Sequence, residues 1–195
     1  MQLIPVFKIG ILNAWIFVAI FLLLPYLLML INKKASKKLG NPTDMKLTKR
    51  EKLISYIGSI IFYIVLLYSI FLPLKLGTTW FYTGLAIFLL AIALMVTAII
   101  NFITTPIDSP VIKGIYRYSR HPGYLSNFLA FIGIGIATSS WVFLLAAIIF
   151  FILVNIGDAN SEERYCIEKY GDTYRDYLNK TPRWIGIPKS STKLY

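Results

Sequence analysis

Long stretches without a charged side chain dominate this sequence and restrict what it can fold into. Such stretches cover residues 9–31, 53–74, 80–103 and 123–157. A helix needs about 20 apolar residues to cross a hydrocarbon layer about 30 Å thick, so each of the first three stretches is long enough for one membrane span. The hydrophobic content of 57% is also too high for a soluble domain of 195 residues. The chain is therefore expected to be a membrane protein.

The fourth stretch is too long for a single span. Its 35 residues would form a helix about 52 Å long at about 1.5 Å per residue. We therefore expect a fold-back at Thr138, Ser139 and Ser140. The predicted fold is an all-α integral membrane protein with five transmembrane helices, of which the fourth is short. The first stretch has no convincing small-residue cleavage site, so we expect it to be retained as a span.

The basic residues are distributed unevenly between the two ends of the predicted bundle. Of the 20 lysines and arginines, eight fall in residues 32–52, three in 104–122 and seven after residue 158, whereas only Lys8 and Lys75 fall on the other side. Cytoplasmic loops carry such an excess, which predicts a cell-membrane protein with its N-terminus outside and its C-terminal helical segment in the cytoplasm. All nine acidic residues fall on the same predicted cytoplasmic side, which places any chemistry there.

The net charge of +11 and the sparse cysteine and histidine content limit the classes of partner. Topology and attraction to anionic lipid explain the basic residues better than nucleic acid does. Cys166 is the one cysteine, which excludes an internal disulfide and a cysteine-rich zinc site. One histidine without clustered ligands does not suggest a metal. The oligomeric state is left open by the sequence.

Two segments depart from the pattern of short polar loops. Residues 101–122 contain three prolines and a glycine, so this segment is not expected to be one regular helix. Because it also contains apolar side chains, we expect it to pack against another part of the protein. The tail from residue 158 is expected to form a charged helix, a break at Gly171 and a second helix that stops before Pro182. We treat 1–195 as a single membrane domain, with three spans in 1–100 and the functional core in 101–186.

The stretch YSRHPGYLSN, residues 118–127, holds the one histidine at the start of the fourth apolar stretch. Proline is favoured in the first helical turn, so Pro122 is expected to begin that helix. Its unpaired amides and positive dipole end, with Arg120 and His121 beside them, form a ready anion site. An alternative that the residues leave open is that Arg120 binds a lipid phosphate and His121 caps the helix.

Glu162 and Glu163 follow the fifth predicted span directly. A helical hairpin returns them to the level of His121. A helix N-terminus that faces a carboxylate across a short gap suits a zwitterion such as an amino acid, whose carboxylate meets the helix and whose ammonium meets the acid. Which of the two glutamates would contact such a ligand is not decided by the sequence.

Together these elements resemble a known family. GIYRYSRHPGYLSN, followed after a hairpin by EERYCIEKYGDTYRDYLNKTPRW, is similar to the isoprenylcysteine carboxyl methyltransferase family, whose wider kin include the phospholipid N-methyltransferases. The resemblance covers roughly residues 100–186. The RHP-x-Y element alone is weaker, because membrane sterol reductases carry a similar pattern.

The resemblance implies S-adenosylmethionine as cofactor, bound at the cytoplasmic mouth, with S-adenosylhomocysteine as product and a lipidic or prenylated molecule as acceptor. The positions that match the family's cofactor-binding residues are Asn101, Asp108, Ser109, Pro110, Val111, Tyr116, His121, Pro122, Gly123, Tyr124 and Glu162.

The chain departs from the family at Asp158, where the eukaryotic enzymes have an arginine that helps to hold the substrate carboxylate. An aspartate there would repel a carboxylate and could instead attract an ammonium or accept a proton from an amine. Arg164 and Arg183 are alternatives for the missing arginine. The candidate catalytic residues are thus Glu162, Asp158 and Arg164. Two rival interpretations remain, an NADPH-dependent membrane reductase and a non-catalytic lipid-binding protein.

Overall fold

The computed structural model describes residues 3, 7–31, 46–106 and 108–189, and within these ranges it contains helices and no strand. Its elements are α1 (Trp15–Ile31), α3 (Lys49–Phe71), α4 (Thr79–Ile103), the 3₁₀ turn η2 (Gly114–Arg117), α5 (Pro122–Ala137), α6 (Trp141–Val154), the π-helical turn η3 (Asn155–Ala159), α7 (Asn160–Tyr170) and α8 (Asp172–Lys180). The all-α prediction is confirmed for the described part of the chain.

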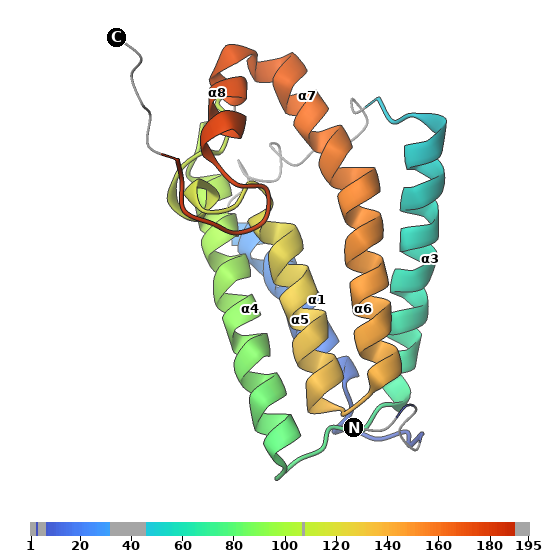
Figure 1. Ribbon diagram of the computed structural model, residues 1–195. Coiled ribbons are helices and arrows are strands. Elements are labelled where there is room, and N and C mark those ends of the chain that lie inside the picture. Colours follow the sequence, from blue (N-terminus) through green and yellow to red (C-terminus); the bar gives the residue numbers. More distant parts are fainter. Residues whose placement is uncertain (1–2, 4–6, 32–45, 107, 190–195) are drawn as a thin grey trace.

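The helices form an elongated bundle in which α3, α4, α5 and α6 run along a common direction and α1 lies behind α5 (Figure 1). Three helices are long and apolar enough to cross a membrane, namely Lys49–Phe71, Thr79–Ile103 and the continuous Trp141–Tyr170. The apolar parts of α1 and α5 are shorter. The count of five spans therefore remains a prediction.

Local sequence signals set most helix ends where they were expected. Pro122 is the first residue of α5, and α5 ends at Ala137 so that Thr138, Ser139 and Ser140 form the turn to α6. The Ser140 hydroxyl caps α6 by accepting from the Phe143 amide at 3.2 Å. Gly171 adopts a positive φ of 57° between α7 and α8, and α8 ends at Lys180. The fold-back, the break and the stop are all confirmed.

Two helix starts differ from the extent of the apolar runs. The first helix begins at Trp15 rather than at residue 9, because the Asn13 side chain donates to the Lys8 and Ile70 carbonyls and the Ala14 amide donates to Leu72. These bonds tie residues 8–14 to the end of α3. Conversely, α3 begins at Lys49, before its apolar run, because Thr48 and Glu51 form a reciprocal capping box.

The fifth span also differs, since the helix does not end near Gly157. It passes through η3 and continues as α7 to Tyr170. The charged segment is therefore continuous with the apolar helix and does not form a helix of its own. In Figure 1 this extension rises above the ends of α4 and α5 and leads to α8, which returns over the loop before α5.

Glycines bring α4 and α5 into close contact. A Cβ at Gly84 would lie 2.4 Å from the Gly133 carbonyl oxygen and 2.4 Å from the Ala137 amide nitrogen. Beside this contact the core is aromatic, with Phe17 stacked on Phe88 at 4.5 Å between ring centroids. Because backbone meets backbone here, neither helix can move aside cheaply when a side chain is added.

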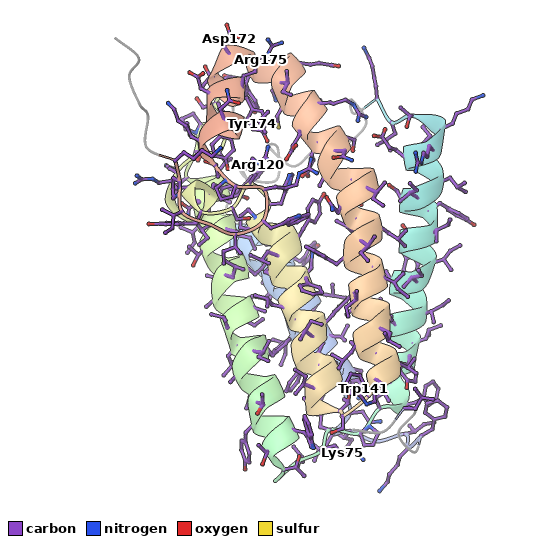
Figure 2. All side chains as sticks on the ribbon, in the orientation of Figure 1. Lys75, Arg120, Trp141, Asp172, Tyr174 and Arg175 are labelled. Carbon is purple, nitrogen blue, oxygen red and sulfur yellow. The ribbon has the colours of Figure 1, made fainter. Side chains whose placement is uncertain are left out.

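The uneven distribution of basic residues between the two ends of the bundle can be followed only for the described residues. Lys75 lies at one end of the bundle, whereas Arg120, Asp172 and Arg175 lie at the other (Figure 2). The basic residues Lys33, Lys34, Lys37 and Lys38 lie outside the described residues. The predicted orientation in the membrane therefore stays a prediction.

Cysteine labelling tests that orientation. In a Cys166→Ser background, Leu76→Cys is expected to react in intact cells with a membrane-impermeant thiol reagent, since Leu76 is exposed at the Lys75 end. Arg175→Cys, whose side chain is also exposed, is expected to react only after the membrane is permeabilised. The opposite labelling pattern would place the α7–α8 end outside the cell.

Gly84→Ala tests the α4–α5 contact. The added methyl group collides with backbone atoms, so we expect a loss of about 1–3 kcal/mol in stability, seen as a lower thermal midpoint in detergent. Gly58→Ala is the matched control, because a Cβ at Gly58 meets its nearest atom, Leu153 Cβ, at an ordinary 3.8 Å. Equal midpoints for the two variants would show that the contact is not this tight.

Candidate functional site

His121 lies at the junction between the loop 104–121 and α5, and its side chain is buried, with 5% of the residue exposed. Its backbone amide donates to the Ser119 hydroxyl at 3.2 Å. The imidazole stacks on Tyr124 from the first turn of α5 and packs against Trp184, with ring centroids 5.5 and 5.8 Å apart. His121 is the N-cap residue of α5, but its side chain makes no cap hydrogen bond to the helix.

Both ring nitrogens of His121 face carboxylates from the first turn of α7. Nδ1 lies 3.2 Å from Glu162 Oε2, and Nε2 lies 3.0 Å from Glu163 Oε1. Neither carboxylate can donate when ionised, so the ring satisfies both only when it carries two N–H groups and a positive charge. The predicted return of the two glutamates to the level of His121 is confirmed by this geometry.

Glu163 is fully engaged by cationic side chains besides His121. Arg183 binds it through two bonds, Nε to Oε1 at 3.0 Å and Nη2 to Oε2 at 2.6 Å, and Arg120 Nη1 lies 3.2 Å from Oε1. The side chain of Glu163 is 12% exposed, whereas that of Glu162 is 41% exposed and contacts His121. Of the two carboxylates, that of Glu162 is therefore the more accessible to a ligand.

The segment after α8 lies over this group, which we call the His121 cluster (Arg120, His121, Glu162, Glu163 and Arg183). The Arg120 amide donates to the Pro182 and Arg183 carbonyls, and the Gly186 amide donates to Tyr118 at 3.0 Å. The Tyr177 hydroxyl donates to the Tyr116 carbonyl at 2.6 Å. The tail therefore folds back onto this end of the bundle. Figure 2 shows Tyr174 of α8 close above Arg120.

The charges around His121 change its proton affinity. Burial by itself would lower the pKa of His121, but the hydrogen bonds to Glu162 and Glu163 outweigh it and raise that pKa above its ordinary value. Burial, with a smaller contribution from the Glu162 charge, raises the pKa of the Tyr116 phenol. The cluster thus favours a charged imidazole and neutral tyrosines.

Asn101, near the end of α4, lies against the start of η2. Asn101 Nδ2 donates to the Thr97 carbonyl at 2.6 Å. Gly114, with a φ of 61°, lies against this side chain so closely that a Cβ would be 1.6 Å from Asn101 Oδ1. Only glycine fits at this position. The Asn101 side chain therefore packs against the first residue of η2, the turn that contains Tyr116.

The remaining predicted cofactor positions lie at the same end of the bundle. Asp108 is exposed, while Ser109, Pro110 and Val111 are half-buried in the loop between α4 and η2. Pro122 is buried, and Gly123 and Tyr124 are half-buried in the first turn of α5. Ile107 lies outside the described residues.

Two of the predicted catalytic residues contact α3 instead of the His121 cluster. Asp158, in η3, accepts from the Ser55 hydroxyl at 2.5 Å. Arg164 forms a bidentate pair with Glu51, with both distances 2.7 Å. Arg164 therefore ties α7 to the start of α3. Arg183, its alternative in the sequence, is the arginine that reaches the cluster.

The structure has features that suit a zwitterionic ligand at this place. The first amides of α5 have no partner within the helix. The space beside Gly123 is open, since a Cβ built there meets nothing within 4 Å. Arg120 Nε is buried without a hydrogen-bond partner among the described residues. A carboxylate finds unpaired donors here, and Glu162 offers an acceptor for an ammonium.

Three residues of this region were not found from the sequence. Trp184 lies at the end of the family-like segment and has no functional signal of its own. Glu51 has the pattern of an ordinary capping residue, and Ser55 is one of several serines in an apolar run. The capping pattern Thr48-x-x-Glu51 was a usable signal for the helix start. Nothing local in the sequence indicates that Glu51 and Ser55 meet residues more than 100 positions away.

Comparison with known proteins gives two findings. Residues 99–173 match the family model of phospholipid methyltransferase. The protein-S-isoprenylcysteine O-methyltransferase of Dictyostelium discoideum is 35% identical over 91 residues, an alignment that covers 40% of this chain and 32% of the relative. The chain thus matches about a third of that relative's length. The predicted resemblance is confirmed for this segment, which contains η2, α5, α6 and most of the His121 cluster.

The raised pKa of His121 predicts a pH-dependent stability. A group with a raised folded pKa contributes its full stabilisation below its unfolded pKa, about 6.5, and loses it as pH rises through the folded value. The thermal midpoint of the wild type is therefore expected to fall as pH rises above about 6.5.

His121→Gln, which cannot titrate, is expected to lose most of this slope. The measurement is thermal unfolding in detergent, followed by circular dichroism over a pH series. An identical slope in both proteins would show that the imidazole is not charged between the glutamates.

Proposed function

We propose that this protein is an integral membrane methyltransferase that uses S-adenosylmethionine and acts on a lipidic or lipidated acceptor. The observation that carries the proposal is the His121 cluster, in which a helix N-terminus with unpaired donors faces the half-exposed carboxylate of Glu162. The match of residues 99–173 to phospholipid methyltransferase supports the reaction class. The named relative supports a lipidated acceptor, since its name specifies a prenylated cysteine.

Specific residues would hold the cofactor. The methionine carboxylate suits the first amides of α5 and Arg120, and the ammonium suits Glu162. Tyr124 and Trp184 offer aromatic faces beside His121. Tyr116 lies in η2, in the loop that leads to His121. Residues 108–111, together with Asn101 behind η2, would line the rest of the cofactor site. When bound, the cofactor supplies an electrophilic methyl group on a sulfonium.

The protein's own contribution is positioning and exclusion of water, because methyl transfer is an in-line displacement that depends on alignment. Glu163 holds Nε2 of His121, which fixes the ring so that Nδ1 faces Glu162. Arg183 and Arg120 in turn hold Glu163. Trp184 and the segment 181–187 cover the cluster. An acceptor carboxylate needs no general base, whereas an acceptor amine does.

The location of the cluster agrees with an acceptor that arrives from the bilayer. It lies at the end of the bundle where α4, α5 and the α6–α7 helix emerge from their apolar stretches (Figure 1). We propose that this end is cytoplasmic in a cell-membrane protein whose N-terminus is outside, with membrane lipids around the bundle. The soluble cofactor would then enter from the cytoplasm.

Ligand binding separates this proposal from its rivals. Purified protein is expected to bind S-adenosylhomocysteine and not to bind NADPH. Binding of NADPH would instead indicate the reductase. Glu162→Ala is expected to weaken binding by about 10-fold or more, because it removes a charge-assisted contact of about 1.5–3 kcal/mol. His121→Ala is also expected to weaken binding, because it removes the group that positions Glu162. Isothermal titration calorimetry in detergent measures this directly.

Glu168→Ala is the matched control, since Glu168 is exposed on the same helix and is expected to leave affinity unchanged. Unchanged affinity in all three variants would show that the cofactor lies elsewhere. If the protein binds neither S-adenosylhomocysteine nor NADPH, the non-catalytic lipid-binding interpretation is favoured.

A further inference from the structure

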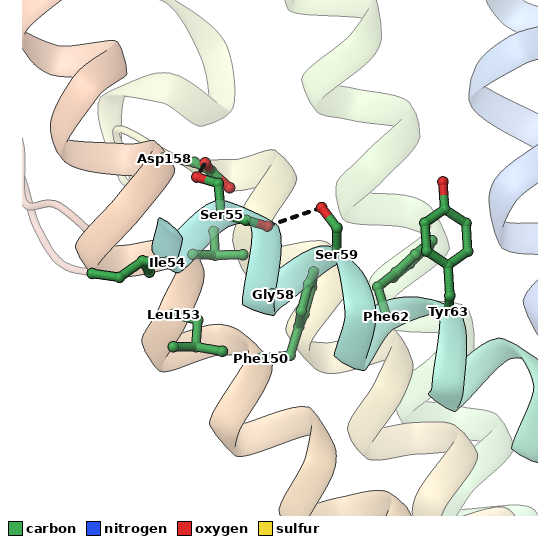
Figure 3. Close-up of a pocket in the computed structure, with 10 residues that line it drawn as sticks. Ile54, Ser55, Gly58, Ser59, Phe62, Tyr63, Phe150, Leu153 and Asp158 are labelled. Carbon is green, nitrogen blue, oxygen red and sulfur yellow. Dashed lines mark hydrogen bonds between the residues drawn. The ribbon is translucent and has the colours of Figure 1, made fainter. Parts of the chain in front are cut away.

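A half-open pocket of about 230 Å³ lies between α3 and the continuous α6–η3 helix. Figure 3 shows it in close-up. Its described lining is formed by Ile54, Ser55, Gly58, Ser59, Phe62, Tyr63, Phe150, Leu153, Val154 and Asp158. The predicted functional positions include one of these ten residues, Asp158.

The pocket has a polar end and an apolar end. Asp158 and Ser55 lie together at one end, and Phe62 and Tyr63 lie at the other (Figure 3). Along α3, Tyr63 lies eight positions after Ser55, which corresponds to about 12 Å. Ser59 Oγ donates to the Ser55 carbonyl within α3, so the donor of its hydroxyl is already used. A ligand with a polar head and an apolar chain matches this gradient.

The polar end lies at the level of a membrane interface. Asp158 is 17 residues along the helix from Trp141, which is about 26 Å in a hydrocarbon layer about 30 Å thick. Phe150 and Leu153 lie deeper along the same helix. A lipid placed with its head at Asp158 would therefore direct its chain toward the middle of the bilayer.

The π-helical turn puts Asp158 in this position. Such turns insert a residue into an α-helix and often occur at functional sites. Here the neighbouring Gly157 packs so closely on α3 that a Cβ would lie 3.0 Å from Ser55 Oγ and 3.3 Å from Ile54 Cγ2. The small residue lets the two helices approach until Ser55 can donate to Asp158.

The pocket's polar end is adjacent to the His121 cluster. Asp158 precedes Glu162 by about one helical turn on the same continuous helix. A head group at Asp158 would therefore be close to a molecule bound at Glu162.

The charge of the pocket selects the head group. None of the ten described lining residues is basic, and Arg164, the nearest arginine along the helix, is engaged by Glu51. An acidic residue at membrane level is costly unless it has a role, and its natural partner is a cation. A carboxylate head group would meet like-charge repulsion from Asp158, whereas an ammonium would meet attraction.

We propose that this pocket, which we call the α3–α6 pocket, binds the acceptor as a lipid amine, with its apolar chain on Phe62 and Phe150 and its ammonium on Asp158. The inference rests on the proposed function, because it assigns the acceptor of the same site. It makes Asp158 a specificity-determining residue that favours an amine over a carboxylate acceptor.

The test uses two photoreactive probes of equal chain length, an alkyl amine and an alkyl carboxylate, with the full-length protein in nanodiscs. The amine is expected to label peptides of α3 and α6 at least about fivefold more strongly than the carboxylate, as a partly exposed ion pair allows. Asp158→Asn is expected to abolish that ratio. Asp172→Asn, which removes a carboxylate with a 97% exposed side chain, is expected to retain it.

A second variant guards against misfolding. Gly58→Val fills the pocket from α3 without a charge change and is expected to reduce labelling by both probes equally. The inference is overturned if the wild type shows no amine preference, or if Asp158→Asn keeps one. It is also overturned if Gly58→Val leaves labelling of these peptides unchanged.

The same preparations separate this inference from the proposed function. If the wild type binds S-adenosylhomocysteine but shows no preference that depends on Asp158, the lipid-amine site fails and the function stands. If the preference depends on Asp158 but no S-adenosylhomocysteine binds, the methyltransferase function fails and the lipid-amine site stands.

Discussion

The contacts of Glu163 hold together the end of the molecule where the candidate site lies. This one carboxylate receives His121 from the start of α5, Arg120 from the loop before it, and Arg183 from the segment after α8. A buried carboxylate is stable only when its charge is compensated, and here cations from three separate segments provide that compensation. Glu163 thereby links the loop, the tail and the imidazole to the start of α7.

That arrangement depends in turn on how the apolar helices are joined. The turn at residues 138–140 reverses the chain, and the continuous helix from Trp141 to Tyr170 returns the glutamates past the end of α5. Had the helix ended near Gly157, Glu162 and Glu163 would lie in a loop with no fixed direction. The π-helical turn keeps the helix continuous while it turns Asp158 toward Ser55 on α3. Glu162 and Asp158 consequently face different neighbours, although about one turn separates them.

The sequence predicted the parts of this structure that local rules control. Pro122, the serine and threonine residues at 138–140 and Gly171 mark helix boundaries through backbone chemistry that acts within a few residues, and all three are where they were expected. The clustering of His121 with the glutamates followed from hairpin geometry. The pairs Arg164–Glu51 and Asp158–Ser55 could not be predicted, because they depend on the rotation of α3 about its axis. An apolar run flanked by lipid contains no periodic signal that sets this rotation.

The division of roles between the two glutamates follows from their exposure. Glu163 is compensated by two arginines and the imidazole and is nearly buried, so removing it would leave several cations unpaired. Glu162 has one ion-pair partner, the His121 imidazole, among the described residues, and 41% of its side chain is exposed. A further cation can therefore approach Glu162 without displacing that ion pair. With His121 charged, the cluster holds three positive and two negative groups. A zwitterion adds no net charge to this set, while it matches the unpaired Arg120 Nε at one end and Glu162 at the other.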